Sequence, residues 1–194
     1  MSKKIFIIFG HNRYKSGSSF NAAIRDTFIE EAKKIGHEID LVNVYEEKQI
    51  KFWDGGGPDE QILDYRKRLE QADIMMVMSP CHNYIMNSAT ENFIANVFTP
   101  PWSFKYKKVF RNYGFPVPNM LKGKTAIISM TYGGPSFFVS AIIQQIPRRI
   151  KKMVFSGLCG MKVKYLRFYE VLPDMPKEIF EKHMEKVRNT ARQL

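Results

Sequence analysis

The first residues that could do chemistry form a polar segment at positions 10–21, which reads Gly-His-Asn-Arg-Tyr-Lys-Ser-Gly-Ser-Ser-Phe-Asn. The segment follows an apolar run at 4–9 that is typical of a buried parallel strand, and it precedes a helical pattern. Serine hydroxyls, main-chain N–H groups and the positive end of a helix dipole together attract an anion. We therefore predict a phosphate site here; the alternative is that Ser18 or Ser19 only caps the helix.

Two later segments also follow predicted strands, Pro-Cys-His-Asn-Tyr at 80–84 and Thr-Tyr-Gly-Gly-Pro at 131–135. In an open α/β sheet the carboxyl ends of the strands share a crevice where the strand order reverses, so the order 2-1-3-4-5 would gather all three segments around one ligand. A phosphate site beside backbone and aromatic groups that border a flat ring suits a flavin. Gly133 and Gly134 let main chain approach a ligand and tolerate positive φ, although an ordinary turn has the same sequence.

The elements that must position these segments alternate between short apolar runs and longer amphipathic stretches, which is typical of a doubly wound α/β fold. The fifth predicted strand alternates basic and apolar residues, as an edge strand does. The stretch 99–122 is predicted to be irregular, and either functional or an interface. The predicted strands are 4–9, 38–44, 73–79, 124–131 and 161–169, and the predicted helices are 20–35, 58–72, 86–98, 136–153 and 175–193.

Length and composition narrow the function classes. A chain of 194 residues with 44% hydrophobic residues supports one domain, residues 1–194. A net charge of +11 favours anionic partners. Cys81 and Cys159 are too few for a disulfide framework or a cysteine-rich metal site, so a reducing cytoplasm and no metal are expected. No signal peptide or membrane span is expected. His37 follows the helix-ending Gly36 and is expected at the surface.

Short pieces along nearly the whole chain match one known family in order and spacing. The matching pieces are Gly10-His11 with Ser19-Phe20-Asn21, Asp40-Leu41 with Tyr45, Leu69 to Asp73, Val97 to Pro100 with Phe104-Lys105-Tyr106, Leu121 to Ala126, Thr131 to Pro135, and Gly157 to Met161. With them the chain resembles the flavodoxin-like NAD(P)H:quinone oxidoreductases, which include DT-diaphorase, the bacterial drug-activity modulator and the potassium-efflux ancillary reductases. The resemblance implies a three-layer sandwich with a five-stranded parallel sheet of order 2-1-3-4-5 and helices on both faces.

The resemblance also implies a function, which is transfer of two electrons from NAD(P)H through a bound flavin to a quinone or similar acceptor in a ping-pong reaction. FMN is expected rather than FAD, because the chain is short. A homodimer is implied, and aromatic residues in 99–115 and along the third helix would suit its interface. The implied cofactor-binding residues are His11, Ser18, Ser19, Phe20, Asn21, Pro80, Cys81, His82, Asn83, Tyr84, Thr131, Tyr132, Gly133 and Gly134, of which Tyr84, Gly133 and Gly134 are also the implied catalytic ones.

The chain departs from the family after the third strand, where Cys81-His82-Asn83-Tyr84 replaces paired aromatics and only Tyr84 keeps aromatic character. Arg66 stands where some members have a Gln near the flavin. The tyrosine and histidine that lie near the hydride-transfer site of DT-diaphorase have no counterpart after Gly134. A flavin-binding regulatory subunit with little turnover is therefore an alternative to an enzyme.

Two further alternatives rest on single features. Cys81-His82-Asn83 has the residue types of a thiol-hydrolase triad, but triads are assembled from positions distant in sequence. A redox-sensing Cys81 is a second reading of the same residues, and a small residue lining the pocket is a third. Basic clusters at 105–111 and 148–152 offer phosphate contacts for nucleic acid, yet no nucleic-acid motif accompanies them.

Overall fold

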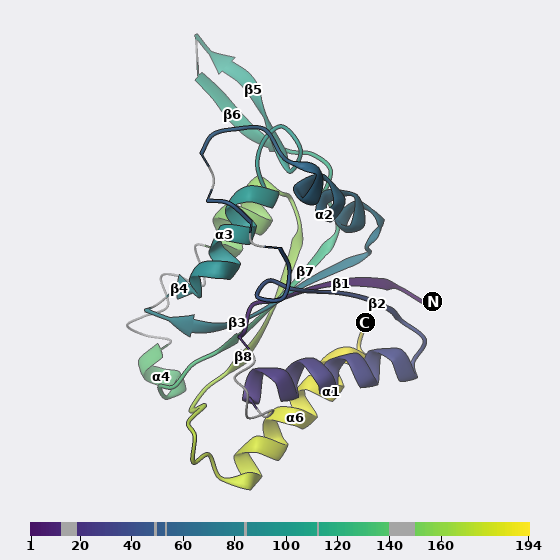
Figure 1. Ribbon diagram of the computed structural model, residues 1–194, viewed down its shortest axis with the longest axis vertical. Helices are drawn as coiled ribbons and strands as arrows, with labels where there is room; N and C mark the ends of the chain where they lie inside the picture. Colours follow the sequence, from purple (N-terminus) through teal and green to yellow (C-terminus); the bar gives the residue numbers. More distant parts are fainter. Residues whose placement is uncertain (13–18, 49, 53, 84, 112, 140–149) are drawn as a thin grey trace.

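The computed structural model describes residues 1–12, 19–48, 50–52, 54–83, 85–111, 113–139 and 150–194, without the side chains of 150–153. Its centre is a parallel sheet in which the strand order is β2-β1-β3-β7-β8 (Figure 1). The predicted order of 2-1-3-4-5 for the parallel strands is thereby confirmed, and so is the edge position of the fifth. The strands are β1 (Lys4–Phe9), β2 (Glu38–Asn43), β3 (Ile74–His82), β7 (Thr125–Thr131) and β8 (Lys162–Phe168).

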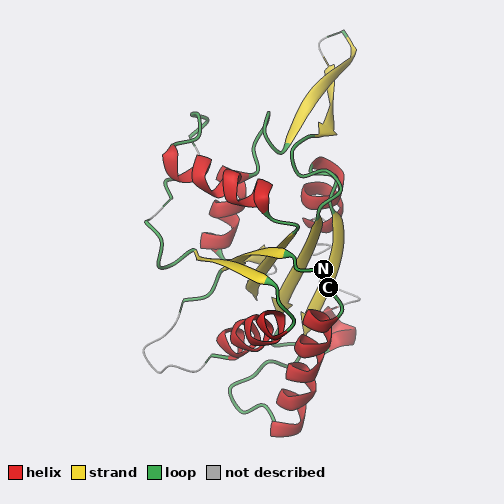
Figure 2. Cartoon of the chain, turned by 90° about the vertical axis from the view of Figure 1, so that its right-hand side faces the viewer, coloured by secondary structure: helices red, strands yellow, loops and turns green. Residues whose placement is uncertain are grey.

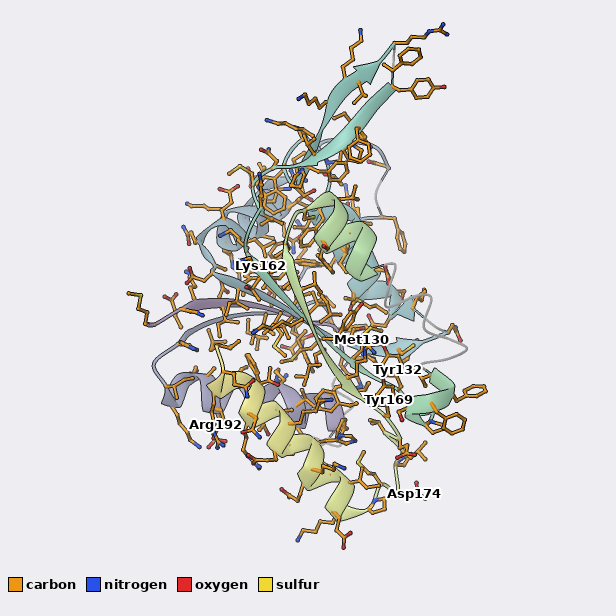
Figure 3. All side chains as sticks on the ribbon, turned by 180° about the vertical axis from the view of Figure 1, so that it is seen from behind. Met130, Tyr132, Lys162, Tyr169, Asp174 and Arg192 are labelled. Carbon is orange, nitrogen blue, oxygen red and sulfur yellow. The ribbon has the colours of Figure 1, made fainter. Side chains whose placement is uncertain are left out.

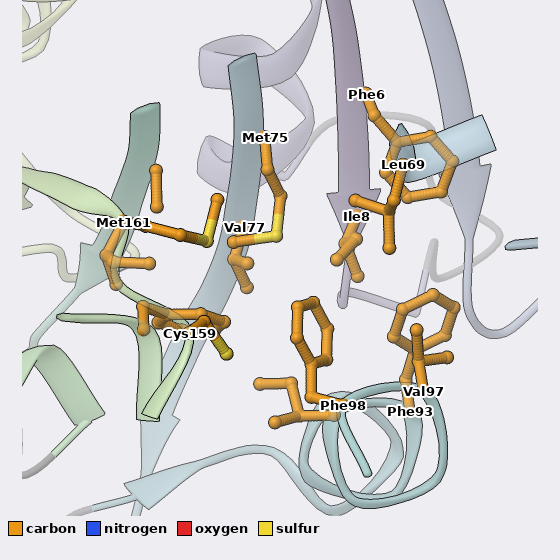
Figure 4. Packing of buried hydrophobic residues seen from close by; sticks show 14 of the residues in the cluster. Phe6, Ile8, Leu69, Met75, Val77, Phe93, Val97, Phe98, Cys159 and Met161 are labelled. Atoms are coloured by element: carbon orange, nitrogen blue, oxygen red, sulfur yellow. The ribbon is translucent and has the colours of Figure 1, made fainter. Parts of the chain in front are cut away.

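Helices cover both faces of the sheet, which confirms the three-layer arrangement. Helices α1 (Phe20–Lys34) and α6 (Lys177–Arg192) lie side by side on one face. The other face packs against α2 (Glu60–Gln71), α3 (Ser88–Val97) and a π-helical segment, Ile150–Leu158. Alternate residues of each strand enter the two cores, because successive side chains of a strand point to opposite faces. Figure 4 shows one core, where Phe6 and Ile8 meet Phe93 and Val97.

Two boundaries differ from the prediction by more than two residues. Strand β3 continues three residues beyond the predicted end, and β4 (Ile85–Met86) pairs back onto Cys81 and His82. Part of the predicted loop 80–84 is therefore strand. The predicted helix at 136–153 begins as α4 (Ser136–Phe138) and ends with the π-helical segment at Leu158; residues 140–149 lie outside the described part of the chain.

The prediction of an irregular stretch at 99–122 is wrong. Strands β5 (Phe104–Phe110) and β6 (Tyr113–Pro118) form an antiparallel hairpin that projects from the body of the molecule (Figures 1 and 2). Pro116 and Pro118 argued against a strand in the sequence, since proline cannot donate to a sheet ladder. A two-stranded hairpin tolerates them, because each of its strands has one free edge.

Arg66 holds the carboxyl-terminal end of α3 in place. The residue is buried, its Nε donates to the carbonyl of Val97 at 3.0 Å, and its Nη2 donates to the Thr99 hydroxyl at 2.6 Å. Its guanidinium lies 5.2 Å from the ring centroid of Trp102, at the root of the hairpin. The prediction that Arg66 corresponds to a glutamine near the flavin therefore does not match its place, because this end of α3 is opposite to the end that adjoins the candidate site.

We expect Arg66→Met to lower the free energy of unfolding by about 1–3 kcal/mol, because the buried acceptors at Val97 and Thr99 lose their donor. The matched control is Lys67→Met at the exposed next position, which should change stability by no more than about 0.5 kcal/mol. Urea unfolding measures both variants. Equal stability of the two variants would contradict the anchoring role.

His37 is buried, with 8% of its surface exposed, so the expectation of a surface histidine is wrong. The main-chain N–H of Lys3 donates to its Nδ1 at 3.2 Å. Its Nε2 is buried without a hydrogen-bond partner among the described residues. Burial lowers the pKa of His37, and the nearby charges of Lys3 and the chain's amino terminus lower it further. Protonation of Nδ1 would also break the bond from Lys3.

This environment predicts a loss of stability in mild acid. The unfolded chain binds a proton at His37 near pH 6.5, before the folded protein does, so the free energy of unfolding should fall as the pH drops below about 6.5. His37→Gln should make the fall between about pH 7.5 and pH 5.5 shallower. A control substitution that removes no titratable group, Leu63→Ser at an exposed position, should leave the slope unchanged. Denaturant unfolding across this range measures the slope, and an unchanged slope in His37→Gln would refute the assignment.

Candidate functional site

A cavity of about 390 Å³ lies at the carboxyl edge of the sheet. It is enclosed by the end of β3, the loop after β7 and the start of the helical segment that follows. The cavity brings together two of the three predicted segments, 80–84 and 131–135. Its lining residues are Cys81, Asn83, Tyr132, Gly133, Gly134, Phe138 and Val139.

The third predicted segment reaches the same edge through the start of α1. The hydroxyl of Ser19 accepts from the main-chain N–H of Ala22 at 3.1 Å, so Ser19 does cap the helix. The same oxygen lies 3.4 Å from His11 Nδ1, and the Thr131 hydroxyl donates to Asn21 Oδ1 at 3.3 Å. Ser18, together with the rest of 13–18, lies outside the described residues.

The segments after β1 and β3 converge, since the N–H of Gly10 donates to the Met78 carbonyl at 2.8 Å. Partial burial lowers the pKa of His11, and the electrostatic influence of His82 lowers it further. His11 is therefore neutral at pH 7. A neutral imidazole can donate or accept a hydrogen bond without adding charge.

Asn87 ties the end of β1 to the start of α3, a role that the sequence analysis missed. Its side-chain Nδ2 donates to the carbonyl of Gly10, and its Oδ1 accepts from the main-chain N–H of Thr90 at 3.0 Å, which caps α3. A Cβ at Gly10 would lie 1.7 Å from the Thr90 hydroxyl oxygen, so this contact requires glycine. An asparagine before a helical pattern is an N-cap signal that would have identified the residue.

The Gly133-Gly134 pair presents main chain to the cavity. The flanking backbone is fixed, because Tyr132 N–H donates to Phe168 at 2.8 Å and the Gly134 carbonyl accepts from Glu170 N–H at 3.2 Å. Within the described ranges no group accepts from the N–H of Gly133 or of Gly134. Neither glycine uses the tolerance of positive φ that glycine offers. Close packing is the constraint at Gly134, where a Cβ would lie 3.2 Å from a Val139 methyl.

The side chain of Tyr132 packs into the protein interior next to this loop. Its ring stacks on Tyr169 with centroids 5.5 Å apart (Figure 3), and its hydroxyl donates to the Met130 sulfur at 3.5 Å. Burial raises the pKa of Tyr132 well above its usual value, so the phenol stays protonated. The side chain is only 4% exposed. Tyr132 therefore offers mainly its backbone to the cavity.

The remaining predicted residues fall in different surroundings. Pro80 is buried in β3, whereas His82 and Asn83 are exposed, and Asn83 has a φ of 48°. The ring of Phe20 packs edge-on against Phe168 and Phe180, away from the cavity, and leaves only its backbone at the start of α1. Tyr84 lies outside the described residues.

A family model described as flavodoxin-like fold matches residues 3–191. The chain belongs to the flavodoxin-like fold family. No curated protein matches it.

Solved structures with this fold align over almost the entire chain. Protein Smu.1420 of Streptococcus mutans superposes with a TM-score of 0.81 at 22% identity, over 98% of this chain and 100% of that one. An NAD(P)H:quinone oxidoreductase of Methanothermobacter marburgensis gives 0.79 at 14% identity, covering 100% and 97%. An FMN-dependent NADH-azoreductase of Bacillus anthracis, in complex with FMN, gives 0.77 at 16% identity, covering 98% of each. At these identities the likeness establishes the fold.

In the described part of the chain, no three His, Cys, Asp or Glu side chains are grouped so as to hold a metal ion. No helix in the same part of the chain is long and apolar enough to cross a bilayer.

Proposed function

We propose that the protein is a flavin-dependent NAD(P)H oxidoreductase that passes two electrons to a quinone or a similar small acceptor in a ping-pong reaction. The observation that carries this proposal is the pair of main-chain N–H groups at Gly133 and Gly134. They adjoin a cavity at the carboxyl edge of the sheet and have no acceptor among the described residues. Relatives in fold that are named as quinone oxidoreductase and as FMN-dependent azoreductase support the same chemistry.

The residues present suit FMN. The hydroxyl of Ser19, the amide of Asn21, neutral His11 and the first turn of α1 would hold the phosphate, together with Ser18 and the backbone of Phe20. The segments 80–84 and 131–134, with Tyr84 among them, would border the ring. When bound, the flavin would supply the hydride acceptor and the two-electron donor of the reaction.

The chain's own contribution is positioning and electrostatics. Donors held in place before reaction stabilise negative charge without a cost of reorganisation, and the N–H groups of Gly133 and Gly134 are held by the neighbouring bonds from Tyr132 to Phe168 and from Glu170 to Gly134. Protonated Tyr132 and neutral His11 add no charge at this edge. No side chain has to act as a nucleophile.

We also propose a cytoplasmic homodimer that buries the surface around the cavity. Exposed apolar side chains gather there beside a second hollow of about 320 Å³, which is lined by residues of the β2–α2 segment and of the start of α3. Aromatic residues are enriched at protein interfaces. The exposed apolar side chains are aromatic Tyr45, Phe52, Phe137 and Phe138 and aliphatic Ile85.

A regulatory subunit that binds flavin with little turnover is the second candidate. The observation that favours it is the segment Cys81-His82-Asn83, of which Cys81 and Asn83 line the cavity, because it offers small polar groups where the resembled family has paired aromatics. Such a wall would hold an aromatic substrate less firmly, because stacking contributes affinity.

Spectroscopy of the purified protein tests the main proposal. We expect visible flavin absorbance, or its recovery when FMN is added to colourless protein. Anaerobic NADH or NADPH should bleach it, and a quinone should restore it. Parallel double-reciprocal plots of steady-state rates would support the ping-pong scheme. Absence of FMN and FAD binding at micromolar concentration would refute the proposal, and flavin binding without turnover would favour the regulatory subunit.

A substitution tests the glycine pair directly. Among the described residues, a Cβ at Gly133 would contact only Leu172, at 3.8 Å, so the fold should accept Gly133→Val while the new side chain crowds the cavity. We expect FMN affinity to fall at least about tenfold, which corresponds to about 1.4 kcal/mol. Gly57→Val is the matched control, since a Cβ there has no neighbour within 4 Å. Quenching of FMN fluorescence measures both; equal affinities would exclude Gly133 from the site.

A further inference from the structure

An open hollow of about 680 Å³ lies between the edge strand β8 and helix α6. Its volume is in the range of small-molecule sites. Helix α6 lies at the end of the molecule opposite to the hairpin (Figure 1), and none of the residues that would hold FMN lines this hollow. The side chains from α6 that define its character recur every three or four residues and so share one face of the helix. They are Lys182, Lys186, Asn189 and Gln193.

The carboxylate at the hollow is already used by arginines of the same helix. Glu185 accepts from Arg188 at 3.0 Å and from Arg192 at 3.4 Å. By contrast, neither Lys182 nor Lys186 forms an ion pair with any described residue. The hollow is therefore bordered by two lysines whose charge no carboxylate of the described chain neutralises.

The main-chain acceptors at the hollow also have donors. Lys186 Nζ donates to the carbonyl of Arg167 at 2.7 Å. His183 Nε2 donates to the carbonyl of Tyr169 at 3.1 Å, since a carbonyl oxygen can only accept. Side chains of α6 thus cover the two carbonyl groups that β8 turns toward this helix.

Hydrogen-bond donors remain in excess. An ammonium group has three N–H bonds, so Lys186 keeps two of them for a ligand. The ammonium group of Lys182 and the side-chain amides of Asn189 and Gln193 have no hydrogen-bond partner within the described part of the chain. The polar groups that the hollow offers to a ligand are therefore mainly donors.

Strand β8 adds a main-chain donor at its free edge. The carbonyl of Phe168 accepts from the N–H of Tyr132 at 2.8 Å, so Phe168 turns its main-chain groups toward β7. The preceding residue, Arg167, turns its main-chain groups outward, as the bond from Lys186 to its carbonyl shows. The N–H of Arg167 has no acceptor in the ranges that the structure describes.

The side chain of Arg167 adds positive charge to the same region. Partial burial lowers the pKa of Lys186, and the charge of Arg167 lowers it further. The guanidinium is therefore close enough to act on the ammonium group. Its Nε is buried and lacks a hydrogen-bond partner among the described residues. A bound anion would reduce the repulsion between these two cations.

We propose that this hollow binds a small molecule that bears phosphate, with phosphate oxygens held between Lys182 and Lys186. A phosphate oxyanion only accepts hydrogen bonds, and it presents several acceptor oxygens to a group of donors. Residues four apart on a helix have Cβ atoms about 5–6 Å apart, so both ammonium groups can reach one phosphate group. Lysine is a common phosphate ligand. The N–H of Arg167 and the amides of Asn189 and Gln193 can complete the shell.

Two other occupants fit the hollow less well. An extended peptide that joined the edge of β8 would need main-chain acceptors as well as donors, but the carbonyls of Arg167 and Tyr169 are bonded to α6. Single-stranded nucleic acid needs free aromatic faces for its bases. The ring of Tyr169 already stacks on Tyr132, and the ring of His183 packs edge-on against Phe168. A small oxyanion needs neither feature.

The inference does not depend on the proposed flavin chemistry. The flavin absorbance of every variant, measured without added phosphate compounds, separates the two proposals. A colourless protein that binds pyrophosphate at this hollow would refute the first and leave the second intact. Because FMN itself bears a phosphate, Ser19→Ala serves as the variant of the proposed flavin site.

Isothermal titration calorimetry with inorganic pyrophosphate tests the site on the full chain. We expect binding with a Kd below about 1 mM at low ionic strength, which corresponds to about −4.1 kcal/mol. Sodium chloride at about 0.5 M should weaken it strongly, because salt screens the lysines. ADP should bind at least as tightly as pyrophosphate, and adenosine should not bind.

Three lysine variants locate the binding surface. Lys182→Gln with Lys186→Gln should reduce the affinity for pyrophosphate at least about tenfold, because two charged donors are lost. Lys182→Arg with Lys186→Arg should keep it, since arginine also binds phosphate. The control combines Lys33→Gln and Lys67→Gln, at exposed positions of α1 and α2. It removes the same charge and should bind as the wild type does. Circular dichroism confirms that each variant is folded.

Several results would overturn the proposal. These are absence of pyrophosphate and ADP binding at low salt, wild-type affinity in the double glutamine variant of the hollow, equal loss in the control, and binding of adenosine as tight as that of ADP. Loss of binding in Ser19→Ala together with wild-type affinity in the variant of the hollow would assign the anion to the proposed flavin site instead.

Discussion

The parallel register of β1, β3 and β7 is the constraint on which the rest of this structure depends. Phe9 pairs with Met78, and Pro80 pairs with Thr131, so the three strands end at one edge of the sheet. The loops that follow therefore meet, and the bonds from Asn87 to Gly10 and from Thr131 to Asn21 become possible. A shift of one residue in any strand would exchange its two faces and separate these partners.

The same topology keeps the two exposed features of the molecule apart. The cavity occupies the carboxyl edge, where helices α1 and α3 begin. The hairpin is inserted in the connection from α3 to β7, which returns to the amino end of β7, and Arg66 and Trp102 fix its root there. A crossover connection can accept an inserted hairpin at that end without disturbing the loops of the site. The lysines of the hairpin therefore lie away from the cavity.

Much of the fold was predictable, because the central strands β1, β3 and β7 are buried on both faces and appear in the sequence as continuous apolar runs. The helix starts at Ser19 and Asp59 carry their capping residues within the sequence. Prediction failed where a residue's role depends on distant partners. Arg66 bonds to residues 31 and 33 positions away, and His37 is covered by the amino-terminal segment. The hairpin was missed because its prolines are compatible only with a free edge.

The sequence by itself determined the α/β class, the strand order expected from its resemblance, and the three segments that could form a site, since local pattern and turn chemistry encode these. Only the tertiary structure decided that close packing constrains Gly134, that neither Gly133 nor Gly134 has a positive φ, and that Phe20 faces α6. It also decided that the aromatic residues of 104–115 stand on a projecting hairpin. The reason is that burial, hydrogen-bond partners and exposure are properties of contacts between segments, which no single segment contains.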